Sequence, residues 1–274
     1  MKTFKEQVHH QQIDVLYRTE YVPWGGSRDG NSVVDISYDS RKRISNIECL
    51  MGNYIYNYDI NYEKMEIVYT CTYKNGEKDN YSYNFAMNSQ GYITDDLLIR
   101  YKYIYENGYL TKIVDGSSLG DGTEIEFEYT DGNLRKVTEF YVKGDNDIVE
   151  RCFWRISYSD DDNISNFNPC FLFEYVSDFY GHNSFWGNIR DFSGFSWKVP
   201  TATAILSHAG LLGKNCTKLP KKITYYSRHG VEDLDINYEL DKNGYVMSVE
   251  TIMVKKDGSH SEYRTIWDFS YKKY

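Results

Sequence analysis

The sequence is poor in proline, in cysteine and in long apolar runs, and each shortage excludes a class of protein. Of its 274 residues, four are proline and five are cysteine. No apolar run approaches the roughly 20 residues of a membrane helix. The cysteines are scattered and form no Cys-x-x-Cys pair, which favours buried free thiols over a zinc site or a disulfide scaffold. Residues 1–20 lack the apolar core of a signal peptide, so we expect none in this chain.

Positive charge is also scarce. The chain has 31 Lys and Arg against 40 Asp and Glu, a net charge of −9. Because phosphate backbones are bound by stripes of Lys and Arg, we expect no nucleic-acid partner. Aromatic residues are abundant instead: 28 Tyr, 13 Phe and 5 Trp. A disordered chain has few aromatics, so this composition predicts a folded protein in which tyrosine forms much of the core.

Apolar or aromatic residues alternate with polar ones in seven short stretches. An alternation of period two predicts β-strands with one buried face. Tyrosine and the β-branched residues also suit a pleated, half-buried surface. The stretches are Val34-Ile36-Tyr38, Tyr54-Tyr56-Tyr58, Tyr81-Tyr83-Phe85, Tyr101-Tyr103-Tyr105, Ile125-Phe127-Tyr129, Trp154-Ile156-Tyr158 and Leu234-Ile236-Tyr238.

Turn residues follow these stretches, and a pair of apolar residues three apart follows most turns. Asn107-Gly108 and Asp131-Gly132 accept the positive φ of tight hairpins. A spacing of three cannot lie on one face of a regular strand, so it predicts a β-bulge at the start of each return strand. The pairs are Ile44/Ile47, Met65/Val68, Leu110/Ile113, Leu134/Val137, Ile164/Phe167 and Val246/Val249.

The pattern predicts an all-β protein with about 16 antiparallel strands. Open twisted sheets rarely exceed roughly 10 strands, so we expect a meander of Tyr-rich hairpins that closes or curls into a barrel. We divide the chain into an N-terminal segment, 1–32, and a single barrel-like domain, 33–271. Within the domain, residues 169–220 form an irregular insertion. A short helix is expected there at 202–212, between Thr201 as its N-cap and Gly213 as its stop.

The insertion is the one place where the sequence predicts a binding site. Ten aromatic residues fall within 171–197. Tyrosine and tryptophan rings stack on ligands while their polar ends form hydrogen bonds. We therefore expect Tyr180, His182, Trp186 and Trp197 to line a site for a glycan or a peptide. The alternative is that the segment plugs one end of the barrel and buries its rings.

No catalytic motif is present. The chain has no Gly-x-Ser-x-Gly elbow, no phosphate-binding glycine loop and no dinucleotide fingerprint. We therefore expect no catalytic residue, no cofactor and no metal site. Acidic pairs such as Asp95-Asp96, Asp160–Asp162 and Asp233/Asp235 keep a hydrolase with a carboxylate pair open as an alternative.

The run from Gly210 to Ile223, GLLGKNCTKLPKKI, leads from the expected helix back into Tyr-rich hairpins. Together with the repeated hairpins, it resembles a family of secreted bacterial proteins of unknown function with a porin-like fold. The resemblance covers 33–271. Family members are predicted envelope proteins, many with an N-terminal lipoprotein signal, which we do not expect in residues 1–20 of this sequence. The resemblance implies a porin-like barrel in the cell envelope, in the periplasm or at the cell surface.

Three functions are compatible with these observations. The first is a non-enzymatic envelope module, structural or ligand-binding, whose barrel is a monomer in water. The second is an outer-membrane pore, and the third is the hydrolase. The alternating stretches span about five to seven residues, short of the roughly 9–11 that cross a bilayer. Their apolar face is mainly tyrosine. Both features favour the first function, without a direct membrane span.

Overall fold

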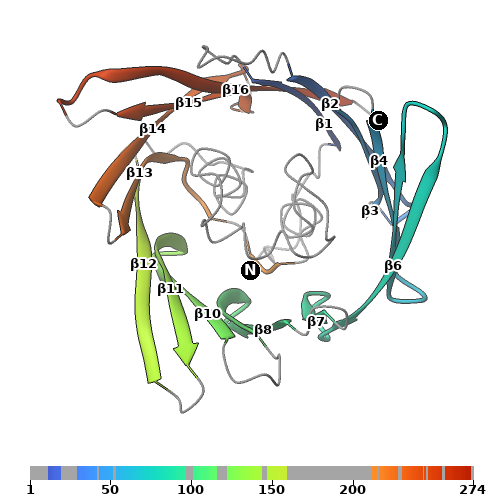
Figure 1. Ribbon diagram of the computed structural model, residues 1–274, viewed down its shortest axis with the longest axis horizontal. Helices are drawn as coiled ribbons and strands as arrows, with labels where there is room; N and C mark the ends of the chain where they lie inside the picture. The colour runs from blue at the N-terminus through green and yellow to red at the C-terminus, as the bar shows by residue number, and fades with distance from the viewer. Residues whose placement is uncertain are drawn as a thin grey trace, which may run out of the picture.

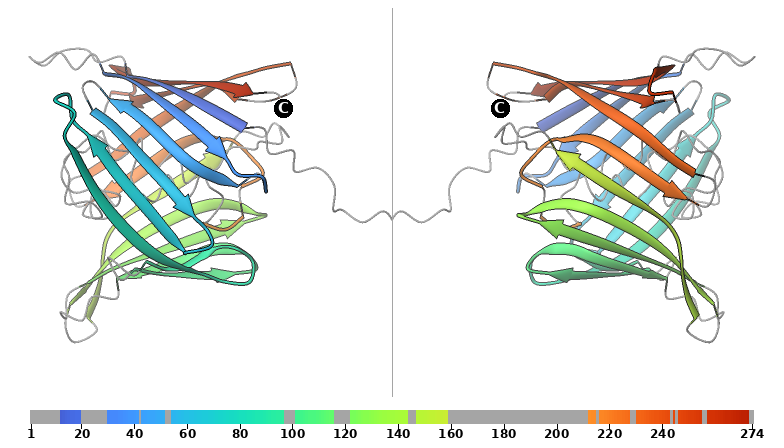
Figure 2. Two further views of the ribbon diagram at one scale, coloured as in Figure 1. Left: turned by 90° about the vertical axis from the view of Figure 1, so that its right-hand side faces the viewer. Right: turned by 90° about the vertical axis from the view of Figure 1, so that its left-hand side faces the viewer.

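A computed structural model shows a closed β-barrel of 16 antiparallel strands, which Figure 1 shows in end view. Strands that follow one another in the chain are neighbours in the sheet, and β1 closes the ring by pairing with both β2 and β16. The strands are inclined across the wall, as the side views of Figure 2 show. The structure describes residues 12–19, 30–41, 43–51, 54–96, 101–115, 122–143, 147–158, 212–214, 216–227, 230–242, 244, 246–254 and 257–272.

The strand bounds follow the alternating stretches but extend beyond them. They are β1 Gln12–Thr19, β2 Gly30–Tyr38, β3 Ile44–Met51, β4 Tyr54–Asn61, β5 Glu66–Thr72, β6 Lys78–Met87, β7 Ile93–Asp96, β8 Tyr101–Glu106, β9 Tyr109–Asp115, β10 Gly122–Thr130, β11 Asn133–Lys143, β12 Asp147–Tyr158, β13 Pro220–Ser227, β14 Gly230–Leu240, β15 Val246–Val254 and β16 His260–Lys272.

The barrel begins earlier in the chain than residue 33. Strand β1 lies within the segment 1–32 that the sequence analysis sets apart, and it pairs along its length with β16. The strand pairing is least extensive between β7 and β8, where the described residues form the single pair Asp95 and Lys102. The return strand expected at Ile164/Phe167 lies outside the described residues. The expected strand number is therefore reached with a different set of strands.

Buried and exposed side chains lie on opposite faces of the barrel wall. Tyr103, Phe127 and Ile113 are at most 4% exposed, whereas Lys102 and Glu128, on the alternate face, are exposed. In a closed barrel the buried face is the inner one, because the described elements leave the outer wall uncovered (Figure 1). The inward orientation predicted for the alternating aromatics is confirmed for Tyr103 and Phe127. The core therefore lines the inside of the barrel.

The predicted bulges are present at four hairpins: the register shifts near the turn in the β2–β3, β8–β9, β10–β11 and β14–β15 pairs. The register also shifts in β6–β7, where the sequence has no such apolar pair. In β10–β11, Leu134 pairs with Tyr129 and Val137 pairs with Phe127, so Arg135 is the extra residue. Both apolar residues of the pair then face inward, and both have no exposed surface.

The prediction for Met65/Val68 is wrong. No register shift occurs between β4 and β5, and the inward residues of β5 are Ile67, Tyr69 and Cys71. The turn before β5 is longer than the tight turns elsewhere, and Met65 closes it with a positive φ of 51° and a largely exposed side chain. The strand therefore starts after Met65.

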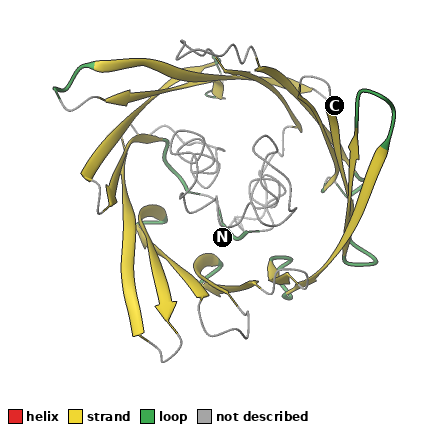
Figure 3. Cartoon of the chain, viewed as in Figure 1, coloured by secondary structure: helices red, strands yellow, loops and turns green. Residues whose placement is uncertain are grey.

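Within the described residues the structure contains strands and connections but no helix (Figure 3). No helix long and apolar enough to span a membrane is found among them. The helix expected at 202–212 lies almost wholly outside the described residues; its last residue, Leu212, lies in a turn. Cys71, Cys152 and Cys216 are buried thiols, not disulfides.

Candidate functional site at the short-turn end

One end of the barrel carries the connections from each even-numbered strand to the next strand, and we call it the short-turn end. At the short-turn end, β8–β9 is joined by Asn107-Gly108 and β10–β11 by Asp131-Gly132. The chain leaves β12 at this end and returns to β13 at the same end. We call residues 212–214 and 216–219, which precede β13, the return segment. This segment is the best-described part of the region that the sequence predicts to be an insertion.

The return segment is bonded to the β10–β11 turn through Asn133. The Asn133 side chain is 1% exposed. Its Oδ1 accepts hydrogen bonds from the backbone N–H of Thr217 at 3.0 Å and of Lys218 at 2.9 Å. Its amide nitrogen donates to the carbonyl of Asp131 at 3.0 Å. One buried amide thus satisfies donors and acceptors from two segments more than 80 residues apart, as buried polar groups require.

A second attachment joins the return segment to the β8–β9 turn. The N–H of Lys214 donates to the carbonyl of Gly108 at 2.8 Å, and Gly213 forms a backbone bridge with Tyr109. Gly213 has a φ of 93°, and a Cβ there would lie 2.8 Å from the Gly108 oxygen. Only glycine fits this close approach. The close approach explains why position 213 is glycine, and the hydrogen bond to Gly108 fixes the backbone of Lys214 beside it.

Cys216 anchors the segment in the core. It is 4% exposed, and its Sγ accepts a hydrogen bond from the N–H of Leu134 at 3.2 Å. Burial raises the pKa of the Cys216 thiol to about 11, and the bond from Leu134 offsets this only in part. A thiol that stays protonated is a poor nucleophile, so Cys216 is structural.

Tyrosine hydroxyls connect successive hairpins at the short-turn end. In each case a tyrosine near or just after the end of one strand donates to a backbone carbonyl at the start of the strand immediately before it in the chain. The pairs are Tyr62 to Ile44 at 2.9 Å, Tyr105 to Ile93 at 2.7 Å, Tyr158 to Leu134 at 2.6 Å and Tyr238 to Pro220 at 2.7 Å. Carbonyls next to the bulges are thereby satisfied.

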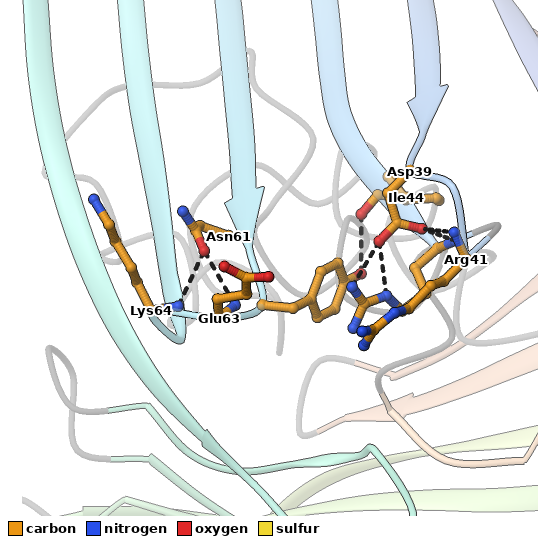
Figure 4. A network of polar contacts seen from close by, with 8 residues as sticks. Asp39, Arg41, Ile44, Asn61, Glu63 and Lys64 are labelled. Atoms are coloured by element: carbon orange, nitrogen blue, oxygen red, sulfur yellow. Dashed lines mark hydrogen bonds and ion pairs between the residues drawn. The ribbon is translucent and has the colours of Figure 1, made fainter.

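Figure 4 shows this end at the β2–β3 and β4–β5 turns. Asp39 accepts from the backbone N–H of Arg41 and of Arg43, each at 2.9 Å, and its carboxylate pairs with the Arg43 guanidinium at 2.6 Å. Burial alone would raise the pKa of Asp39, but these hydrogen bonds outweigh it and lower the pKa. The Arg43 guanidinium lies 3.9 Å from the centre of the Tyr62 ring. This part of the rim is internally paired.

The rim near the return segment differs from that part. Lys214 Nζ lies 5.2 Å from the centre of the Tyr109 ring, and the Tyr109 and Tyr129 rings are 4.9 Å apart. The Arg135 guanidinium lies 4.8 Å from the centre of the Tyr158 ring. Cations and partly exposed tyrosine rings therefore alternate over this surface. This surface therefore offers charged hydrogen-bond donors and ring faces side by side.

The four residues predicted to line a binding site, Tyr180, His182, Trp186 and Trp197, lie outside the described residues, and the site stays a prediction. The rings and cations beside the return segment were not predicted as a site. The sequence did hold a signal for this surface, because the run 210–223 that leads back into the hairpins carries Lys214 and Lys218.

Sequence reasoning also missed a carboxylate inside the barrel. Glu139 is fully buried, and the Cys152 thiol donates to its Oε2 at 3.4 Å. Glu139 pairs with Ile125 of β10 and so lies on the inner face. The bulge predicted from Leu134 and Val137 was the available signal, since Glu139 lies two residues beyond the inward Val137.

The acidic pairs do not assemble a carboxylate centre where the structure describes them. On β14, Asp233 pairs with Lys222 at 2.6 Å, and Asp235 contacts His260 at 3.1 Å. Burial would raise the pKa of Asp233, but hydrogen bonds from Lys222 and Thr224 outweigh it and lower the pKa. No group of three or more His, Cys, Asp or Glu residues that could hold a metal ion occurs in the described part of the chain.

Comparison with solved structures identifies a similar fold. A porin-like protein from Bacteroides uniformis superposes with a TM-score of 0.62 over 96% of this chain and 98% of its own, at 14% identity. A porin-like protein from Bacteroides vulgatus gives a TM-score of 0.44 at 17% identity, covering 94% of this chain and 97% of its own. No protein-family model and no curated protein matches the chain. The first likeness shows the fold: this is a porin-like β-barrel.

Proposed function

We propose that the protein is a non-enzymatic module of the bacterial cell envelope, structural or ligand-binding, whose barrel stands in water. The envelope location rests on the family resemblance and on the porin-like fold of the Bacteroides uniformis protein. The aqueous setting rests on the polarity of the wall. A porin-type membrane barrel has an apolar outer face and a polar lumen, and here the two are reversed.

The outer wall is charged at the middle of its strands, and this observation carries the proposal. Lys112, at the centre of β9, pairs with Glu124 at 2.5 Å and Glu126 at 3.4 Å. Glu126 is the central residue of β10. In a membrane barrel these positions would face the bilayer centre, where a lipid-facing Lys costs about 2–4 kcal/mol.

Hydrogen-bonded polar side chains continue this pattern around the outer wall. Each contact joins neighbouring strands, so the polar groups satisfy one another across the sheet. The contacts are Asn46 to Asn57 at 2.9 Å, Asn46 to Asp59 at 2.7 Å, Thr70 to Asn80 at 2.8 Å, Ser82 to Glu66, and Asn237 to Glu250 at 3.1 Å.

The inner wall supports the same proposal. Val137 and Val249 have no exposed surface, and Tyr69 is 1% exposed. Tyr69 also packs against Tyr56, Tyr58 and Tyr81, with ring centres 4.9–6.2 Å apart. A water-filled channel would leave such inward residues exposed.

The outer-membrane pore remains a second candidate because of strand number and length. Barrels of 16 strands are wide enough for a channel. The expectation of strands too short to cross a bilayer is wrong for part of the wall: β11 has 11 residues, β12 has 12 and β16 has 13. The residues that β11 and β12 add beyond their alternating stretches include Tyr141, Ile148 and Val149, which are exposed. Strand length therefore does not distinguish the aqueous barrel from the pore. The polarity of the outer wall is what favours the aqueous barrel.

Purification without detergent, followed by light scattering and planar-bilayer recording, tests the proposal. We expect a monodisperse monomer without detergent and no channel conductance. A protein that aggregates unless detergent is present, and that then conducts ions, would establish the pore instead. The test is sharp because the pore predicts the opposite result in both measurements.

We also propose that the aromatic insertion carries ligand binding, for a glycan or a peptide, through Tyr180, His182, Trp186 and Trp197. Support comes from the return segment, which ties the C-terminal side of the insertion to the wall through Asn133. A rigid attachment of this kind suits a binding loop. A Trp186→Ala variant should keep the fold and lose the intrinsic-fluorescence response to a glycan and peptide panel that the parent chain shows.

A further inference from the structure

The surface beside the return segment holds cations that no carboxylate of the described residues neutralises, in a protein of net charge −9. Lys214, Lys218 and Arg135 form no ion pair with any described residue. Lys112 and Lys222 on the outer wall are each paired with a carboxylate at 2.5–2.6 Å. These two wall lysines therefore link neighbouring strands, whereas Lys214, Lys218 and Arg135 are bonded to no described carboxylate.

The fold holds the three cations at fixed points around two strand turns. Lys214 is placed by the bond of its N–H to Gly108, and Lys218 by the bond of its N–H to Asn133. Arg135 is the extra residue of the β10–β11 bulge. The backbone at each point is hydrogen-bonded or part of the sheet, so little ordering is needed when a ligand binds.

We propose that Lys214, Lys218 and Arg135, with the rings of Tyr109 and Tyr129, bind a polysaccharide whose sugar units carry carboxylates. The rings offer stacking surfaces for sugars, and the cations offer charged hydrogen-bond donors for the carboxylates. The proposal deepens the binding role proposed above, but it rests on described residues and not on the aromatic insertion.

Charge spacing favours this ligand over nucleic acid. The same turns carry Glu106 and Asp131, both exposed, so the cations do not form an unbroken positive surface. Duplex DNA presents a charge every 1.7 Å or so and is bound by continuous basic stripes. In a polymer with one carboxylate per sugar, the negative charges are spaced apart. Uncharged parts of the sugars can therefore lie over Glu106 and Asp131.

Binding of the full chain to polygalacturonate, measured by calorimetry in low salt, tests the proposal. The variant Lys214→Gln/Lys218→Gln/Arg135→Gln should bind about tenfold more weakly, as expected for three lost exposed ionic contacts. The control Lys74→Gln/Lys78→Gln/Lys102→Gln removes the same charge from exposed lysines away from this end and should change affinity less than about twofold. Affinity should also fall as salt rises.

The proposal would be overturned by no binding to polygalacturonate, by equal losses in the two triple variants, or by equal binding to neutral dextran. Binding to anionic phospholipid vesicles in preference to polygalacturonate would also overturn it. If the glutamine variant is less stable to heat, Lys214→Arg/Lys218→Arg serves as the second variant and should retain affinity within about twofold. A barrel that needs detergent but still binds polygalacturonate would refute the aqueous barrel alone.

Discussion

The two faces of the β10–β11 hairpin carry equally regular patterns but have different physical roles. Ile125, Phe127 and Val137 face inward and are at most 4% exposed. Glu126 and Glu128 face outward with side chains 46% and 60% exposed, and both lie near lysines. Burying a large apolar side chain contributes about 1.5–3 kcal/mol, whereas an exposed ion pair contributes about 0–1 kcal/mol. Stability should therefore depend on the inner face, and the outer face should govern solubility.

Paired truncations on one strand provide the strongest test of this difference. Phe127→Ala should lower the free energy of unfolding by about 3–5 kcal/mol, because it removes a buried ring from a packed interior. Glu126→Ala, one residue away on the outer face, should lower it by less than about 0.5 kcal/mol. Urea denaturation of both variants measures the difference. Similar losses in the two would show that the wall is not sorted by face.

A thiol in the core provides a second test, through pH. Cys216 has a pKa of about 11 in the folded protein against 9 as its ordinary value. The unfolded chain therefore ionises first as pH rises above 9, and the stability contributed by the neutral thiol is lost between pH 9 and 11. The loss should reach about 2–3 kcal/mol. Denaturation from pH 8 to 11 should show it in the parent chain.

The Cys216→Ser variant isolates this effect, because serine stays neutral throughout the range. Tyr62, whose pKa burial raises to about 12, destabilises both proteins alike at high pH. The difference between parent and variant therefore reports Cys216 alone. If both lose stability equally between pH 8 and 11, the thiol is in contact with water and the return segment is not packed as described.

Much of the wall was predictable because it follows from local alternation. The inward position of Tyr103 and the bulge at Leu134 and Val137 both follow from spacing alone. Strand β1 was missed because pairing of Gln12–Thr19 with β16 depends on contacts between the two ends of the chain. Asn133 was missed for a similar reason: its partners Thr217 and Lys218 are distant in sequence. Local pattern predicts which face a residue occupies, and it does not predict long-range attachment.

The smallest expected effect concerns the hydroxyl of Tyr158, at the short-turn end of the wall. Tyr158 donates to the Leu134 carbonyl at 2.6 Å, next to the β10–β11 bulge. Tyr158→Phe keeps the ring and removes the donor, so the free energy of unfolding should fall by about 1 kcal/mol. Tyr226→Phe is the matched control, because the Tyr226 ring stacks on Phe153 at 4.4 Å and its hydroxyl bonds to no described residue. The control should change stability by less than about 0.5 kcal/mol. Equal effects would mean that the tyrosine-to-carbonyl bonds at the short-turn end contribute nothing beyond ring packing, leaving the bulges stabilised by burial of their apolar pairs alone.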